Sequence, residues 1–250
     1  CSVFILGGMT SCEDFLDKRE DVGLTEDDIF RDYYSLRGFL DQSFNQLENI
    51  MVMDNWENGR AFVGLFADEM ATTDNSSAVF TLHSGNWLSN AKSNTTFEIG
   101  NGGSTAISRS YKALRINNRI INDIDKAPLT PEQKNEILGQ AYFYRSWFYF
   151  QIIKRYGGMP IIDKVFEGGD DDIPRVTYHE SHDWMMEDIQ KAIYMLPDSW
   201  DDPNYGRPTK ITAMALKEWA QLFDASPLMQ NDLNSTENKG YDTERAKSAA

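Results

Sequence analysis

The chain has 250 residues, of which 41% are hydrophobic and 25% charged, the balance of a globular protein with a substantial core. Its formal net charge of −15 at pH 7 and its pI of about 4.6 disfavour general nucleic-acid binding and a polybasic membrane patch, since both require clustered Lys and Arg. The sequence has no run of roughly 18 apolar residues, the length that a membrane-spanning helix needs.

The N-terminal residues have the pattern of a bacterial lipoprotein signal peptide. In "VFILGGMTSC" a short apolar run is followed by small residues and then by Cys12. We expect cleavage before Cys12 and lipidation of its thiol, which assigns residues 1–11 to the remnant of the signal peptide. A buried strand with an incidental cysteine is the alternative. The two cysteines, Cys1 and Cys12, are too close to the N-terminus to form a disulfide framework.

Both ends of the sequence suggest that it is part of a longer chain. Residue 1 is Cys rather than Met, and the final "YDTERAKSAA" begins a helix, capped by Asp242 or Thr243, without a stop signal. We therefore expect residues 25–250 to form one helical domain that is truncated at its C-terminus.

The first predicted helix follows a polar tether over residues 12–24. Thr25 is a typical N-cap, with acidic residues in the first turn. Apolar residues then recur at helical spacing, which predicts one helix from residue 26 to about residue 51; they are Ile29, Tyr33, Leu36, Leu40, Leu47 and Met51. Residues 54–103 are rich in Asn, Ser, Thr and Gly, which predicts irregular, loop-dominated chain.

Two helices are predicted between residues 105 and 156. The first has apolar residues on one face from about Thr105 and ends before Pro128. The second begins in "LTPEQ", where Thr130 is the N-cap and Gln133 completes a capping box. It ends at about Tyr156, because "GGMP" follows and neither glycine nor proline favours a continuing helix.

Two more helices are predicted after a loop. Thr177 opens a capping box, and the helix through "HDWMMEDIQKAIYML" ends at Pro197. After a polar, turn-rich segment, Thr209 begins the helix "KITAMALKEWAQLF". With no convincing alternating strand, the sequence predicts a mostly all-α fold.

The helix within "ILGQAYFYRSWFYFQIIKRYGGMP", residues 137–160, has aromatic residues on every side. A helix that is apolar all round must be covered all round. Stacked helical hairpins provide such cover, because each hairpin buries the apolar face of its neighbour. We therefore predict tetratricopeptide-like hairpins, with long inserted loops since the spacing exceeds the usual repeat of roughly 34 residues.

The order of several motifs resembles the SusD/RagB family of outer-membrane nutrient-binding lipoproteins. These motifs are "GQAYFYRSWFYFQIIKRYGGMPII", "RVTYHESHDWMMEDIQKAIYMLP" and "GRPTKITAMALKEWAQLF", together with "EDFLD" after Cys12 and "LTEDDIF". The resemblance implies a cell-surface lipoprotein that captures oligosaccharides, or peptides in RagB-like members, and delivers them to a TonB-dependent, SusC-like transporter.

The resemblance also implies that the protein is not an enzyme and needs no cofactor. The sequence has no nucleophile elbow or phosphate-binding loop, although its 39 acidic residues leave room for a glycosidase carboxylate pair. From the residues alone, a helical-repeat adaptor that binds only proteins remains the alternative class.

The predicted ligand-binding residues lie in the loop-rich segment. Sugars are bound by exposed aromatic planes and by fixed polar side chains. The candidates are Trp87, Asn90, Asp68, Glu69, Arg60 and Asn86, the first two supported by the family's use of an aromatic residue and an Asn in this region. The alternatives are that Trp87 packs the loop onto the helices and that Asp68 and Glu69 form a salt bridge or a helix cap.

The other tryptophans fall into two groups. Trp147, Trp184 and Trp219 lie on apolar helices and are predicted to pack in the core. Trp56 and Trp200 lie in polar segments, where exposure, transporter contact and loop packing all fit.

Structural roles are predicted for three further features. Arg145 lies among aromatic residues and needs a carboxylate or carbonyl partner if it is buried. His179 and His182 lack the spacing of a zinc site and are expected to face water in a first helical turn. The run Asp170–Asp172 is expected to be a solvated loop, with adventitious calcium as the alternative.

Overall fold

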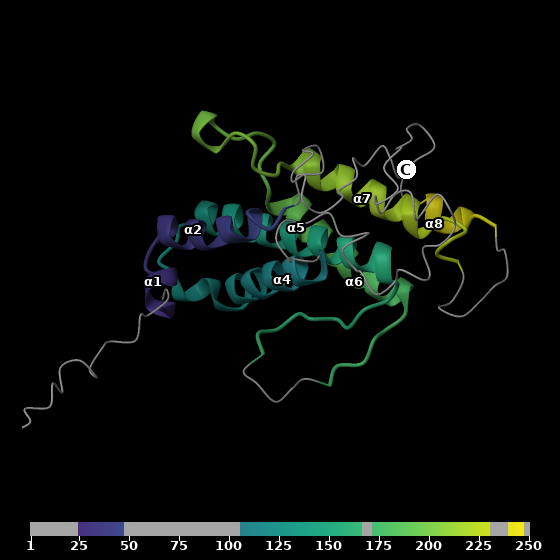
Figure 1. Ribbon diagram of the computed structural model, residues 1–250. Helices are drawn as coiled ribbons and strands as arrows, with labels where there is room; N and C mark the ends of the chain where they lie inside the picture. The colour runs from purple at the N-terminus through teal and green to yellow at the C-terminus, as the bar shows by residue number, and fades with distance from the viewer. Residues whose placement is uncertain (1–24, 48–105, 167–171, 231–239, 248–250) are drawn as a thin grey trace, which may run out of the picture.

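The computed structural model describes residues 25–47, 106–166, 172–230 and 240–247, and every regular element within these ranges is a helix (Figure 1). The predicted all-α fold is confirmed. In chain order the elements are α1 (Glu26–Phe30), α2 (Tyr33–Phe44), α4 (Ala106–Asp123), η5 (Ile124–Lys126), α5 (Pro131–Tyr156), α6 (Tyr178–Met195), η6 (Asp202–Asn204), α7 (Lys210–Asp224) and α8 (Thr243–Lys247).

Four helices begin at the threonines predicted as N-caps. The side chains of Thr25, Thr130, Thr177 and Thr209 each accept a hydrogen bond from the backbone N–H three residues ahead. In the reciprocal bond of the capping box, the backbone N–H of each threonine donates to the side chain of the residue three ahead. These bonds satisfy donors that a helix start leaves unpaired, which is why the sequence located the starts to the residue.

The single helix predicted over residues 26–51 is wrong. The chain breaks after α1, where Asp32 adopts an extended backbone with φ −157° and its carboxylate accepts from the N–H of Ser35 at 2.8 Å. Asp32 therefore caps a new helix, α2, inside the apolar pattern. That helix ends at Phe44, so Leu47 lies beyond it. Met51 lies outside the described residues.

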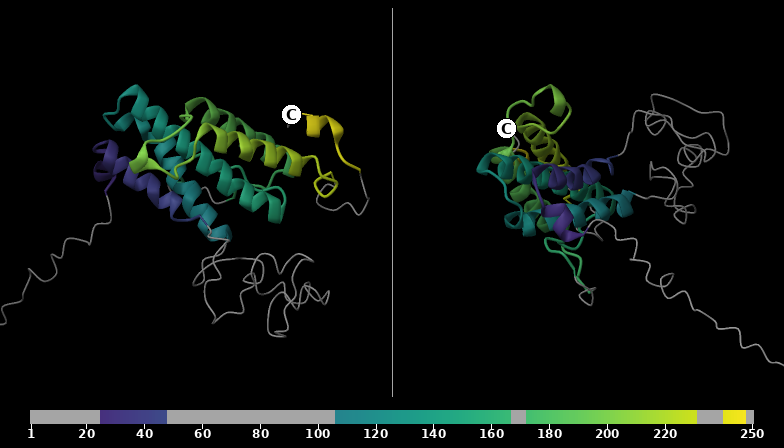
Figure 2. Two further views of the ribbon diagram at one scale, coloured as in Figure 1. Left: turned by 90° about the horizontal axis from the view of Figure 1, so that it is seen from above. Right: turned by 90° about the vertical axis from the view of Figure 1, so that its left-hand side faces the viewer.

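Helix α5 occupies the centre of the helical block. It packs against α4 on one side and α6 on another, and it also contacts α2 and α7 (Figures 1 and 2). Buried residues occur on all sides of its middle turns, and Tyr144, Tyr149 and Phe150 are almost fully enclosed. The prediction that neighbouring helices surround the aromatic helix is confirmed.

Arg145 of α5 is part of a buried polar network in this core. Its guanidinium donates to both carboxylate oxygens of Asp188 on α6, at 2.5 and 2.8 Å, and to the side-chain oxygen of Asn118 on α4 at 2.9 Å. Asn118 in turn donates to the carbonyls of Ile162 and Lys164, at 2.9 and 3.1 Å. The predicted carboxylate partner of Arg145 is thereby identified, and one network joins three helices and the loop after α5.

The two glycines after α5 have distinct roles. Gly157 ends the helix with φ +75°, a conformation that side chains disfavour. At Gly158 a β-carbon would lie 2.0 Å from the carbonyl oxygen of Val176, so the chain entering α6 passes directly against it. Arg175 donates to the carbonyl oxygen of Gly158 at 2.8 Å and fixes this approach.

The tryptophans only partly follow the prediction. Trp147 and Trp184 are partly buried and pack against the core. The ring of Trp219 packs against that of Phe150, with the centroids 5.0 Å apart, but 44% of its surface is exposed, so the prediction that it lies in the core is only partly confirmed. Helix α7 buries Ala213, Leu216 and Ala220 and leaves its opposite side open within the described part of the chain.

Of the tryptophans in polar segments, Trp200 is half-buried. Its indole N–H donates to the carbonyl oxygen of Pro208 at 2.8 Å, which favours loop packing over exposure. Trp56 lies outside the described residues.

Candidate functional site

A groove of about 610 Å³ is lined by residues of α6, α7 and α8. Helix α8 lies beside the C-terminal end of α7 (Figure 1). Charged and amide side chains make up most of its lining. The complete lining is His182, Asp183, Met186, Glu187, Gln190, Lys191 and Tyr194 from α6, Lys217, Gln221 and Asp224 from α7, and Arg245 from α8.

Asp224, in the lining of this groove, connects the three helices. Its side chain is 2% exposed. One carboxylate oxygen accepts from Nδ1 of His179 on α6 at 2.9 Å, and the other accepts from Arg245 on α8 at 2.5 Å. Because a carboxylate only accepts, Nδ1 of His179 carries the proton in this contact. Arg245 also donates to the carboxylate of Asp183 at 3.2 Å, so this arginine links the short α8 to both α6 and α7.

The sequence left two candidates for the N-cap of α8, Asp242 and Thr243, and the structure distinguishes them. The carboxylate of Asp242 accepts from the backbone N–H groups of Glu244 and Arg245, both at 3.0 Å. Asp242 rather than Thr243 is therefore the cap, and the turn it stabilises places Arg245 opposite Asp224.

The expectation that both histidines face water is wrong. His182 is 4% exposed, and the ring of Tyr178 stacks on it with the ring centroids 6.3 Å apart. Its Nδ1 lies 3.1 Å from the carboxylate of Asp183 and 3.8 Å from that of Asp224. Burial lowers the pKa of His182, against the opposing effect of Asp224. His179 is half-buried through its contact with Asp224.

The groove can offer hydrogen bonds, but several of its charged groups pair with other protein side chains. Lys217 donates to Gln190 at 3.0 Å, and Lys191 lies 3.4 Å from the carboxylate of Asp188. Within the described ranges no three His, Cys, Asp or Glu side chains are grouped as a metal ion would require. The arrangement suits helix-to-helix attachment and weak polar contacts.

The side chains predicted to bind a ligand lie elsewhere in the sequence. Trp87, Asn90, Asp68, Glu69, Arg60 and Asn86 all fall between α2 and α4, outside the described residues, and so does the predicted lipidation site Cys12. Their roles stay predictions. Of the acidic run, Asp170 and Asp171 are likewise outside the described residues, and Asp172 is exposed.

None of the helices in the described ranges combines the length and the apolar composition needed to cross a membrane.

Known proteins share this helical arrangement. A SusD-like protein from Bacteroides fragilis superposes with a TM-score of 0.58 at 24% identity, covering 80% of this chain and 37% of that one. A SusD-like carbohydrate-binding protein from Bacteroides vulgatus gives a TM-score of 0.60 at 15% identity, covering 87% of this chain and 44% of that one. At these identities the likeness shows the fold alone.

Sequence similarity points the same way. The SusD-like protein P38 of Formosa agariphila is 28% identical over 102 residues, which are 40% of this chain and 20% of that protein. The chain thus spans about a fifth of the length of this curated relative. A family model described as "Starch-binding associating with outer membrane" matches residues 14–217, which is most of the sequence. The chain therefore belongs to the SusD-like family.

Proposed function

We propose that this protein binds oligosaccharides at the outer-membrane surface and delivers them to a TonB-dependent, SusC-like transporter. The family match over residues 14–217, with its description as starch-binding and outer-membrane-associated, carries this proposal. In this function the helices form a rigid support around α5, and loops inserted between them contact the ligand. Lipid attached to Cys12 would hold the support at the membrane.

The ligand contacts in this proposal come from the segment between α2 and α4. Trp87 would stack on the apolar face of a sugar ring, and Asn90 with Asp68 or Glu69 would bond its hydroxyls. Arg60 and Asn86 would add further polar contacts. The protein binds in this proposal without catalysing a reaction, and it requires no cofactor.

Substitution of Trp87 tests the proposal. Trp87→Ala should weaken the binding of soluble starch by roughly 3- to 10-fold, because an aromatic stacking contact contributes about 0.5–1.5 kcal/mol. Trp87→Phe keeps a stacking plane and should retain most of the affinity. The measurement is affinity electrophoresis in gels with and without starch, repeated with a panel of neutral polysaccharides. Equal retention of wild type and Trp87→Ala would remove Trp87 from the site.

A protein-binding adaptor is the second candidate, and one observation favours it. The open side of α7 exposes Ile211, Met214, Trp219 and Leu222, at 44–67% of their surfaces. An apolar helix side of this kind suits contact with another protein. If the wild-type chain binds no member of the polysaccharide panel but binds peptides or a transporter, the peptide-binding or adaptor function replaces glycan capture.

A further inference from the structure

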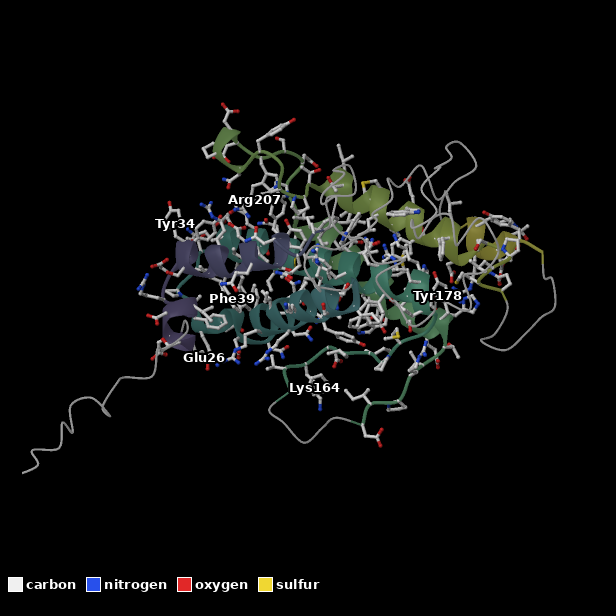
Figure 3. The ribbon with its side chains drawn as sticks, in the orientation of Figure 1. Glu26, Tyr34, Phe39, Lys164, Tyr178 and Arg207 are labelled. Carbon is white, nitrogen blue, oxygen red and sulfur yellow. The ribbon has the colours of Figure 1, made fainter. Side chains whose placement is uncertain are left out.

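The loop between α6 and α7, residues 197–209, is fastened to the helical block at several points. The N–H of Lys210 donates to the carbonyl of Pro197 at 2.9 Å and closes the base of the loop. Arg207 donates to both carboxylate oxygens of Asp41 on α2, at 2.7 and 2.9 Å, and to the side chain of Gln140 on α5 at 3.0 Å. The loop therefore lies in a fixed position over α2 (Figures 2 and 3).

A second link brings the tip of this loop to the start of α2. Arg37 of α2 donates to the side-chain oxygen of Asn204 at 3.2 Å, and the amide of Asn204 donates to Asp201 at 2.7 Å. Gly206, two residues after Asn204, has φ +94°, a conformation that glycine adopts readily and that lets the chain turn sharply before Arg207. These contacts hold the loop tip that carries Tyr205.

Two tyrosines flank this link and face outward. Tyr205 is 90% exposed, and Tyr34, on the first turn of α2, is 73% exposed. Figure 3 labels Tyr34 at the outer side of this helix. The guanidinium of Arg37 lies 5.4 Å from the ring centre of Tyr34 and supports that ring. Because Asn204 precedes Tyr205 directly and bonds to Arg37, the loop tip that carries Tyr205 is joined to the part of α2 that carries Tyr34.

The chemistry of this surface is that of a sugar-contacting site. It combines exposed aromatic planes with amide, guanidinium and carboxylate groups whose positions are already fixed, so little conformational entropy would be lost on binding. The open side of α7 differs, because three of its four exposed large hydrophobic residues, Ile211, Met214 and Leu222, are not aromatic. The nearby carboxylates of Asp32, Asp41 and Asp201, in a chain of net charge −15, favour neutral over anionic ligands.

We propose that Tyr34 and Tyr205, held by Arg37, Asn204 and Arg207, form an auxiliary binding surface for neutral polysaccharide chains, distinct from the segment that contains Trp87. This inference rests on the proposed glycan-binding function. An auxiliary contact would act on long chains that reach both surfaces, since a second tethered contact raises the apparent affinity. A short oligosaccharide would occupy only one of them.

The test compares long and short ligands with a double variant of the full chain. Tyr34→Ala/Tyr205→Ala should lower retention in starch gels by about 3- to 10-fold, the effect expected from losing one or two stacking contacts. Binding of maltoheptaose, measured by calorimetry, should change less than twofold. Tyr241→Ala is the matched control, because Tyr241 is 56% exposed and belongs neither to this loop nor to the lining of the groove formed by α6, α7 and α8. It should leave both measurements unchanged.

Hydroxyl-radical footprinting gives an independent readout. Starch should protect Tyr34 and Tyr205 in the wild type and leave Tyr241 unprotected. Unchanged retention of the double variant, or no protection of either ring, overturns the auxiliary surface while the Trp87 site stands. A wild type that binds no neutral glycan overturns both.

Discussion

At the scale of single residues, His182 shows how packing changes the behaviour of a side chain. Burial lowers the pKa of its imidazole from the usual value of 6.5, so the folded chain takes up this proton less readily than the unfolded chain. The stability that depends on neutral His182 is therefore complete above the unfolded pKa of 6.5 and is lost as the pH falls below it.

This difference predicts an acid-sensitive stability. Between about pH 7.5 and pH 5.5, the free energy of unfolding should fall in the wild type and fall less in His182→Gln, because the variant has no buried imidazole to protonate. Urea unfolding at both pH values measures the two slopes. His179→Gln is the control, since His179 is more exposed. Parallel slopes for wild type and His182→Gln would contradict the prediction.

The burial of His182 was not predictable from its local sequence. The residues that enclose and face it include Tyr178 on its own helix and Asp224, the last residue of the next long helix, α7. The partner of Arg145 was predictable in kind, because a buried guanidinium needs a carboxylate, but Asp188 is one of many acidic residues. The candidate glycan residues such as Trp87 remain predictions.

At the scale of the elements, local chemistry predicted helix starts better than helix continuity. Threonine caps and capping boxes involve residues three apart, and the sequence displays them directly. The break at Asp32 was missed because the apolar spacing continues through it, from Ile29 in α1 to Leu36 in α2. An Asp three residues before Ser35 was the available signal.

The return of the chain from α5 to α6 depends on one glycine. Gly158→Ala should destabilise the protein by about 2–4 kcal/mol, because the new methyl group would meet backbone atoms of Val176 and Thr177 at 2.0–2.7 Å. Gly38→Ala is the matched control: this glycine lies in α2 with nothing within 4 Å of an added β-carbon. The control should gain about 0.5–1 kcal/mol from helix propensity.

Urea denaturation of Gly158→Ala, Gly38→Ala and the wild type measures their free energies of unfolding. A Gly158→Ala protein that unfolds within about 0.5 kcal/mol of the wild type would show that the loop shifts aside at little cost.

At the scale of the whole molecule, the aromatic composition of α5 predicted the arrangement of its neighbours. A helix with buried residues on every side requires cover from several directions, and α2, α4, α6 and α7 supply it. The sequence did not predict which side of α7 would remain open. That depends on which helices lie beside it, and periodicity within α7 carries no such information.

Membrane attachment is the prediction that concerns the whole molecule. Cys12→Ala should leave the precursor uncleaved, because lipidation of this thiol precedes cleavage of a lipoprotein signal peptide. Fractionation of expressing cells, with and without globomycin, measures how much of the protein is cleaved and how much is in the membrane fraction. Cys1→Ala serves as the control. A Cys12→Ala protein that matures normally and stays in the membrane fraction would contradict the anchor.

The central position of α5 has a consequence for biosynthesis. During translation the rings of α5 emerge before α6 and α7, and until residue 224 has been made one flank of Phe150 has no lining. A nascent chain that pauses in this interval exposes hydrophobic surface that is prone to aggregation and that chaperones recognise. Slow codons or ribosome stalling between residues 156 and 224 should therefore promote misassembly more than the same delay placed after residue 224.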